Sequence, residues 1–466
     1  MGLTVTNTNT LALLNILNRT TAAQSTSLLR LSTGKKINKG SDDPAGLIAV
    51  QSLNAELVAV NAAINNGQRA NSVLDTADGA LVEVGNLLAE IESLAAASTN
   101  SGGLSPAEIS ANQAQIDTAI ASINSIIQNT TFNGKKLLDG QQSIRVSLDA
   151  TAQTDVSDVR VFSRPTSQSS QSFAVNVVTA GAVASATLAT APSTVSAAEF
   201  AVAGNLGTAT ITVTDGEALT SIRDKIIATA SETGVSASVS GGDLHIQSRE
   251  FGDDAFVSAS RISGDTDFVT VAHTTGTDAN VTVNGQTAFV DGLRVSFNSN
   301  GTSGELFLTT AGNAAGTAGS ITINGGGLTF QLGSSSSTQA TLGVEALFSH
   351  QLGNSVAGYL SELKSGGAND LSSGANNAVL IARAAQTQVA TARGRIGGFQ
   401  KYRVETSINS LNATREALES ARSIINDVDF AAETAELARL NVLTQSAIAL
   451  LGVASQQSAA ILSLLR

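Results

Sequence analysis

Both ends of the chain carry long stretches in which apolar residues recur at helical spacing. These two stretches, residues 6–31 and 427–465, contain no proline and place Leu, Ile, Ala and Val on a background of Asn, Gln, Ser and Thr. A helix with such a stripe must bury it against another surface. We therefore expect the terminal helices to pair with each other and with further copies of the chain, which is typical of a self-assembling structural protein.

Seven-residue spacings at both ends predict a seam of the coiled-coil type, interrupted by Thr10, Thr21 and Gln24. The predicted assembly seam consists of Leu3, Leu14, Leu17, Leu28, Leu31, Leu437, Leu440, Leu451, Ile461 and Leu465. Charge favours an antiparallel pair, because no acidic residue precedes Asp42 while the last helix starts with several acids. Exposed ion pairs contribute only about 0–1 kcal/mol, so these charges would set register more than stability.

Helical spacing continues inside the terminal stretches and predicts a bundle. The sequence Ser-Asp-Asp-Pro at residues 41–44 is a helix start signal for a long helix over about 44–98. Ser105 and Glu108 form a capping box that opens a second helix. The predicted helical bundle core consists of Leu53, Val60, Leu74, Leu81, Leu88, Ile116, Ile123, Val404, Leu411, Leu418 and Ile425.

Between residues 164 and 352 the helical spacing mostly disappears, and Ser, Thr, Gly and Val dominate short strand-like runs. Asn284-Gly285 and Asn324-Gly325 predict hairpin turns, and one helix is expected over about 217–230. The fold class is therefore α+β: a long antiparallel helical coiled coil and bundle with a β-rich insertion. We expect three domains: 1–43 with 428–466, 44–163 with 353–427, and the insertion 164–352.

Composition argues against several classes of function. A net charge of −12 disfavours non-specific nucleic-acid binding. The chain has no cysteine, and its three histidines are scattered, so we predict no metal, no cofactor and no catalytic residues. The N-terminus has no secretory signal pattern. Asn, Gln and Ser within 440–465 would be costly in lipid, so we expect no membrane span.

Several motifs occur in an order and spacing that resemble those of a known family. They are SLLRLSTG at 27–34, DDPAG at 42–46, DTADGAL at 75–81, TFNG at 131–134, SARSIINDVDFA at 420–431 and ILSLL at 461–465. Together they closely resemble the two conserved ends of bacterial flagellins. In addition, ITVTDGEAL at 211–219 and GTDANVTVNG at 276–285 resemble the hook-type insertion motif, which implies a small α/β unit in the insertion.

The resemblance implies a structural subunit that self-assembles into the extracellular filament of the bacterial flagellum and serves motility. It further implies export in unfolded form through the flagellar type III apparatus and polymerisation at the distal tip. The implied partners are many copies of the chain itself, an export chaperone, a cap protein and junction proteins. In that arrangement the terminal coiled coil forms an inner tube, the bundle forms an outer tube, and the insertion faces solvent.

One motif departs from the family pattern. Many flagellins carry a basic Gln-Arg-x-Arg-Glu-Leu-Ala patch that a vertebrate innate receptor reads, whereas residues 89–95 here read AEIESLA. Glu90 and Glu92 replace the two arginines, which reverses the charge and removes hydrogen-bond donors. We therefore predict weak or no activation of that receptor.

The sequence is also compatible with two alternative functions. A hook–filament junction protein would share the terminal helices. An enzymatic or sugar-binding module could instead be carried by the insertion, with the ends as a scaffold, although no convergent set of polar residues supports it.

Overall fold

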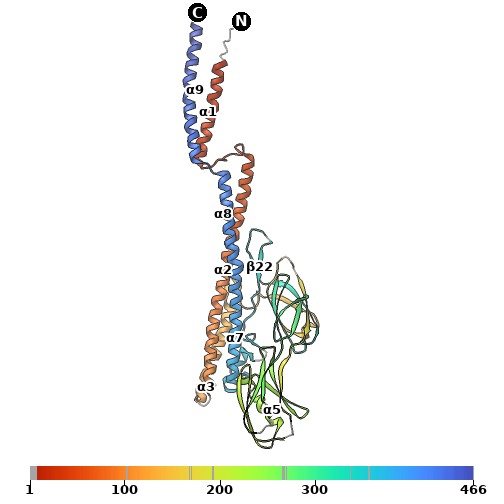
Figure 1. Ribbon diagram of the computed structural model, residues 1–466. Helices are drawn as coiled ribbons and strands as arrows, with labels where there is room; N and C mark the ends of the chain where they lie inside the picture. The colour runs from red at the N-terminus through yellow and green to blue at the C-terminus, as the bar shows by residue number, and fades with distance from the viewer. Residues whose placement is uncertain are drawn as a thin grey trace. The chain divides into compact units, whose positions relative to one another are not determined.

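The computed structural model describes residues 8–464, apart from 101–102, 167, 169, 191–193, 265–267, 269, 336 and 355–356. The side chains of 9, 190, 194 and 457–464 also lie outside this description. The chain divides into two compact units, one formed by residues up to Asn65 and from Ile408 onward, the other by Asn66–Ser407. Figure 1 shows the helices and strands of both units.

The first unit is helical. It contains α1 (Thr8–Thr33), the beginning of α2 (Pro44–Ser98), most of α8 (Thr406–Asn426) and α9 (Phe430–Leu464). Helix α1 ends where Gly34 adopts a left-handed φ of +69°. Lys36 N then donates to Asn426 O at 2.6 Å, and Val428 N donates to Gly34 O at 3.1 Å. The two connections are thereby joined, and α1 and α9 lie side by side (Figure 1).

Short acidic side chains start the long helices of this unit. Asp43 Oδ1 accepts from Gly46 N at 2.9 Å at the start of α2, as the sequence predicted. Asp429 Oδ1 accepts from Ala431 N at 2.9 Å at the start of α9. Asp42 instead holds the preceding loop, since its carboxylate accepts from Asn38 N and Lys39 N; these hydrogen bonds lower its pKa.

The second unit contains the rest of α2, α3 (Pro106–Asn129), α7 (Leu371–Phe399) and a π-helical segment, Gln400–Glu405. The predicted capping box at the start of α3 is confirmed: Ser105 Oγ accepts from Glu108 N, and the Glu108 carboxylate accepts from Ser105 N. Shorter helical elements are α4 (Ala152–Asp155), α5 (Leu219–Ala228), α6 (Ala230–Thr233) and a 3₁₀ helix (Leu360–Leu363). Buried residues of α5 include Leu219, Ile222 and Ile226, in agreement with the helix expected there.

Two antiparallel sheets enclose one apolar core of this unit. Their orders are β16-β15-β5-β20-β3 and β17-β18-β19-β4. The strands are β3 (Ile144–Leu148), β4 (Val156–Ser163), β5 (Gln171–Thr179), β15 (Asn280–Val283), β16 (Gln286–Thr287), β17 (Phe289–Asp291), β18 (Arg294–Ser299), β19 (Thr302–Leu308) and β20 (Gly316–Gly326). Phe173 and Phe297 meet in this core with ring centroids 6.0 Å apart.

Two further sheets and α5 enclose a second core, with orders β14-β13-β8-β9 and β11-β12-β6. The strands are β6 (Val183–Thr190), β8 (Ala198–Gly204), β9 (Gly207–Val213), β11 (Val235–Ser240), β12 (Asp243–Phe251), β13 (Phe256–Gly264) and β14 (Val271–Thr275). Phe200 stacks on Phe268 there at 4.8 Å. Small two-stranded pairs are β1 (Thr131–Phe132) with β2 (Lys135–Lys136), β7 (Thr194–Val195) with β10 (Glu217–Ala218), β21 (Leu328–Gln331) with β22 (Gln339–Leu342), and β23 (Gly353–Asn354) with β24 (Gly358–Tyr359).

The α+β class is therefore confirmed: helical terminal parts carry a β-rich middle. The turn at Asn284-Gly285 also forms, with φ of 56° and 78° between β15 and β16. The turn predicted at Asn324-Gly325 is wrong, because both residues lie inside β20. That strand pairs with β3 on one side and with β5 on the other. Asn324 and Gly325 lie in a register shift between Ile323 and Gly326 in the pairing with β3, while the pairing with β5 ends at Ile323.

Two described helices are long and apolar enough to cross a membrane by length and composition alone. They are α2 and residues Phe430–Gln456 of α9, with mean hydropathies of 1.5 and 1.4 over their most apolar windows. Buried core helices and assembly helices also meet this criterion of length and composition, so it does not distinguish them from membrane spans. The direction in which the apolar side chains point is more informative.

Candidate assembly surface

The face that α1 and α9 turn toward each other mixes leucine with polar and small residues. Along α1 the less exposed positions recur at alternating spacings of three and four: Thr10, Leu13, Leu17, Thr20, Gln24, Ser27 and Leu31. Along α9 the corresponding positions are Glu433, Leu437, Leu440, Thr444, Ala447, Leu451 and Ala454. This is a heptad pattern, but threonine, serine and alanine occupy many of its core positions.

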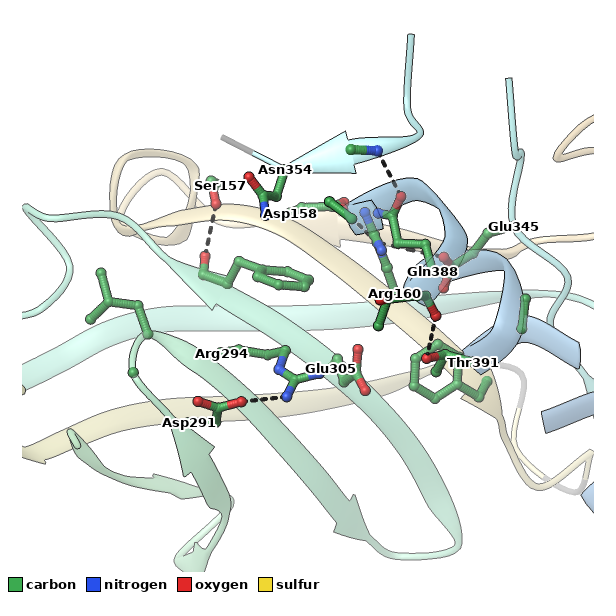
Figure 2. Close-up of a pocket in the computed structure, with 18 of the residues that line it drawn as sticks. Ser157, Asp158, Arg160, Asp291, Arg294, Glu305, Glu345, Asn354, Gln388 and Thr391 are labelled. Carbon is green, nitrogen blue, oxygen red and sulfur yellow. Dashed lines mark hydrogen bonds and ion pairs between the residues drawn. The ribbon is translucent and has the colours of Figure 1, made fainter. Parts of the chain in front are cut away.

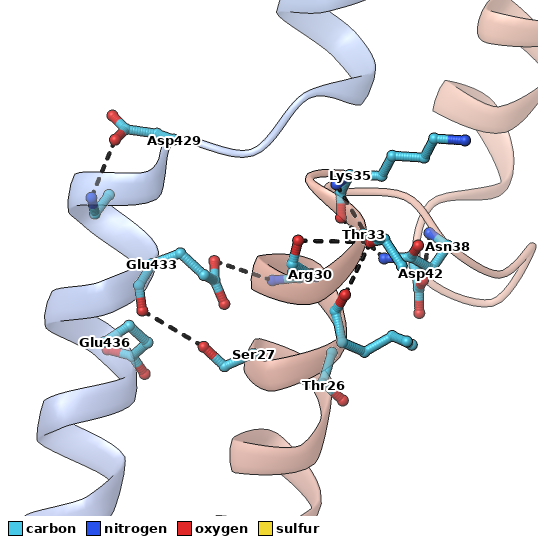
Figure 3. Close-up of polar contacts among 12 residues, drawn as sticks. Thr26, Ser27, Arg30, Thr33, Lys35, Asn38, Asp42, Asp429, Glu433 and Glu436 are labelled. Atoms are coloured by element: carbon cyan, nitrogen blue, oxygen red, sulfur yellow. Dashed lines mark hydrogen bonds and ion pairs between the residues drawn. The ribbon is translucent and has the colours of Figure 1, made fainter.

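Specific polar contacts fix the antiparallel register of this pair (Figure 3). Ser27, only 2% exposed, places its Oγ 3.5 Å from the backbone oxygen of Glu433. Arg30 Nη1 lies 3.8 Å from the Glu433 carboxylate. One helical turn earlier in α1, Gln24 Nε2 donates to Asn441 Oδ1 at 2.6 Å. The antiparallel arrangement expected from the charges is thus the one observed, although the long ion pair contributes little to stability.

The large apolar residues of α1 and α9 largely point away from this contact. On α1 they are Leu11, Leu14, Ile16, Leu28 and Leu29. On α9 they are Phe430, Val442, Leu443, Ile448, Leu450 and Val453. Several are more than half exposed, including Val442 at 62% and Ile448 at 56%. An apolar surface of this extent marks a surface that another molecule covers.

The structure divides the predicted seam residues between two faces. Leu17, Leu31, Leu437, Leu440 and Leu451 lie on the α1–α9 contact face. Leu14 and Leu28 are exposed on the other side, Leu28 by 50%. Leu3 and Leu465 lie outside the described residues, as does the side chain of Ile461. Sequence reasoning missed Thr20 and Ser27, whose buried positions only the three-four spacing could have revealed.

The residues assigned to the bundle core lie in both units. In the second unit, the fully buried ones are Leu74, Leu81, Leu88, Ile116, Ile123 and Val404. In the first unit, Val60 is buried, whereas Leu53, Leu411, Leu418 and Ile425 are half-buried along α2 and α8. A long contact of 3.5 Å between Arg422 and Asn54 joins those two helices. Here too, large apolar side chains point to solvent: Ile48, Val58 and Ile424.

The two glutamates of the altered receptor patch differ in their surroundings. Glu90 is exposed on α2. Glu92 pairs with Arg383 of α7 at 2.7 Å and accepts from Gln386 Nε2 at 2.8 Å. The hydrogen bond from Arg383 holds the pKa of Glu92 below its usual value. Glu92 is therefore charged and already engaged within its own chain.

The second unit also contains a cavity of about 870 Å³ between the outer face of the β17-β18-β19-β4 sheet and α7 (Figure 2). Its lining is a mixture of aromatic, acidic and arginine side chains. Gln388 Oε1 accepts from Gly353 N at 2.8 Å at one side. Within the described part of the chain, no group of three or more His, Cys, Asp or Glu residues is placed to hold a metal ion.

Terminal helices that leave apolar residues uncovered are typical of the class of self-assembling structural proteins. Comparison with known proteins identifies the family. Residues 5–143 match the bacterial flagellin N-terminal helical region, and residues 379–465 match the bacterial flagellin C-terminal helical region.

The similarity extends over whole chains. B-type flagellin of Pseudomonas aeruginosa is 30% identical, with 100% of both chains covered. Flagellin of Salmonella typhimurium is 28% identical, with 99% of both covered. The chain belongs to the bacterial flagellin family, and it is a structural subunit of the extracellular flagellar filament. Among solved structures, FliC from Burkholderia pseudomallei is 17% identical, with 71% of this chain and 99% of that chain covered and a TM-score of 0.25.

Proposed function

We propose that copies of this chain polymerise by covering the outward apolar faces of α1 and α9, so that residues 1–43 with 428–466 build an inner tube. Residues 44–163 with 353–427 build the outer tube, through side chains such as Ile48 and Ile424, and residues 164–352 face solvent. The observation that supports this arrangement is the placement of leucine, isoleucine and valine away from the α1–α9 contact. Burying such side chains contributes about 1.5–3 kcal/mol each, which is repeated in every subunit.

Deleting the chain from Val428 onward tests this proposal. The truncated protein should remain a soluble monomer, because it lacks the outward apolar residues of α9 that copies would share. Sedimentation velocity and negative-stain microscopy provide the readout, with the full-length chain under identical conditions as control. Filaments of ordinary length and diameter from the truncated protein would overturn the proposal.

Membership of the flagellin family also suggests an export route and specific protein partners. We infer export in unfolded form through the flagellar type III apparatus with a chaperone, growth under a cap protein and attachment through junction proteins. We also infer that the chain has no catalytic activity, no cofactor and no nucleic-acid or membrane partner. A minor role as a hook–filament junction protein is the alternative, and copy number in sheared filaments separates the two. Hydrolase and glycan-array screens of the full chain test for a module in the insertion.

We further infer weak or no activation of the vertebrate innate flagellin receptor. Glu90 and Glu92 put negative charge where the family pattern has arginine, and Glu92 is paired with Arg383. A receptor-reporter assay should give little response to the wild-type chain. The double variant Glu90→Arg, Glu92→Arg should raise it, and a full response to the wild type would contradict the inference.

A further inference from the structure

Three carboxyl groups lie near two arginines in the cavity of the second unit, so one carboxyl group is in excess (Figure 2). Arg160 of β4 lies 2.7 Å from Asp158. Arg395 of α7 lies 2.8 Å from Glu305 of β19 and stacks over the ring of Phe162. These two arginines and two acids are thus matched one to one. Glu345 is the surplus acid, and its nearest cation is Arg160 at 3.5 Å.

Glu345 is poorly solvated for a charged group. Its side chain is 23% exposed, but its Oε1 atom is buried and has no hydrogen-bond partner. A buried carboxylate oxygen without a partner is costly, and protonation lowers that cost because it removes the surplus charge. Burial accordingly raises the pKa of Glu345 to about 7, although Arg160 and Arg395 act in the opposite direction.

Glu345 lies in a segment that leads out of the β-rich middle. Residues 342–347, here called the strap, begin at the last residue of β22 and continue beyond it. Gly343 N donates to Phe162 O at 2.7 Å, and Val344 N donates to Gln142 O at 3.1 Å. Leu342, Val344 and Leu347 are buried. The strap is therefore held by backbone hydrogen bonds and apolar contacts on either side of the one ionisable side chain it carries.

The remaining charged groups around the cavity do not supply the missing cation. Asp291 and Arg294, from β17 and β18, pair with each other. Strand β12 contributes Arg249 and Glu250, which carry opposite charges. Among the described residues, no lysine or histidine lines the cavity. When Glu345 is ionised, the acids of the cluster outnumber the arginines; when it carries a proton, the charges balance.

We propose that Glu345 acts as a proton-operated latch of the strap: protonation in a mildly acidic medium fastens residues 342–347 to β4 and α7, and ionisation in a neutral or alkaline medium loosens them. The proton is exchanged with solvent, and no covalent bond changes. The latch lies within one subunit, so it is independent of how copies of the chain assemble.

The direction in which pH shifts the closing of the strap follows from proton linkage. The pKa of Glu345 is higher in the closed state than the ordinary value of 4.5, so the closed state binds the proton more tightly than an open state with a solvated carboxyl group. Closing is therefore favoured at acidic pH. It weakens as pH rises from 4.5 to about 7, and the effect is constant above that range.

Hydrogen exchange with mass spectrometry on the full-length chain measures this opening directly. After correction for intrinsic exchange rates, opening of peptides that contain the strap should increase about tenfold to a hundredfold between pH 5 and pH 8. Glu345→Gln should abolish that pH dependence and keep the strap as protected as in the wild type at low pH. Glu416→Gln, an exposed glutamate of α8, serves as control and should behave like the wild type.

Two results would overturn the latch. One is wild-type protection of the strap that does not change over this pH range. The other is a Glu345→Gln variant that keeps the wild-type pH dependence, since another group would then be responsible. If circular dichroism shows that Glu345→Gln does not fold, Glu305→Gln replaces it, because it frees Arg395 for Glu345. Loss of pH dependence in that variant supports the latch, and full retention rejects it.

Discussion

The α1–α9 pair and the helices of the second unit differ in which side chains they bury within one chain. In the second unit, α2 and α3 bury leucine and isoleucine completely, as at Leu88 and Ile116. In the α1–α9 pair, Thr20, Ser27 and Ala447 are buried beside Leu440, while many of the large apolar side chains face outward. The difference indicates that the second unit completes its apolar core within one chain. Under the proposed arrangement, the outward apolar residues of the terminal pair are buried when other copies cover them.

The largest effect is expected from placing charge on the outward face of α9. Val442→Asp combined with Ile448→Asp should abolish polymerisation, because an unpaired carboxylate would have to be buried at every subunit contact. The melting transition of the second unit should stay unchanged. Turbidity and electron microscopy measure assembly, and calorimetry measures melting. Gln286→Asp combined with Thr287→Asp, both exposed in β16 of the second unit, is the matched control; normal assembly of the Val442 and Ile448 double variant would contradict the comparison.

Removing a buried side chain from the second unit should have a smaller effect than the loss of assembly. It should have a larger effect on stability than any substitution at the α1–α9 contact. Leu88→Ala removes a fully buried side chain and should lower the free energy of unfolding of that unit by about 2–5 kcal/mol. Denaturant titration measures the loss. Leu14→Ala, at an exposed position of α1, should leave the same transition unaffected. Equal losses in both variants would show that the two regions do not differ as described.

Making the seam apolar should strengthen the isolated terminal pair. The hydroxyl groups of Thr20 and Thr444 bond to carbonyls of their own helices, Ile16 O and Leu440 O, so their removal leaves no donor unpaired. Thr20→Val with Thr444→Val should stabilise the α1–α9 pair of the monomer by about 1 kcal/mol. Helicity by circular dichroism and hydrogen exchange report the gain. Thr21→Val, on the exposed side, should produce none.

The smallest effect is expected at the exposed ion pair between α2 and α7. A double-mutant cycle with Glu92→Gln and Arg383→Gln should give a coupling free energy of about 0–1 kcal/mol, since Arg383 is largely exposed. The coupling should fall at high salt. A coupling several times larger would show that Glu92 is a structural anchor of the second unit rather than a surface group.

The sequence predicted the local elements well because their signals are local. The start of α2 at Pro44, the capping box at Ser105 and the turn at Asn284-Gly285 each depend on residues a few positions apart. The end of β20 was predicted wrongly, because Asn324-Gly325 carries a turn signal; in the structure these two residues form a register shift in a strand that continues to pair with β3 at Gly326. The excess carboxyl group at Glu345 was also invisible, since Arg160 is far from it in the sequence.

By itself, the sequence determined that both termini are striped helices and that their charges favour an antiparallel pair. It could not decide which stripe each helix buries within one chain, because α1 carries apolar side chains on more than one face. Tertiary structure decided this: the backbone hydrogen bonds from Lys36 to Asn426 and from Val428 to Gly34 join the helix ends. Rotation about each helix axis is thereby restricted, so Thr20 and Ser27 face α9 while Leu28 points outward.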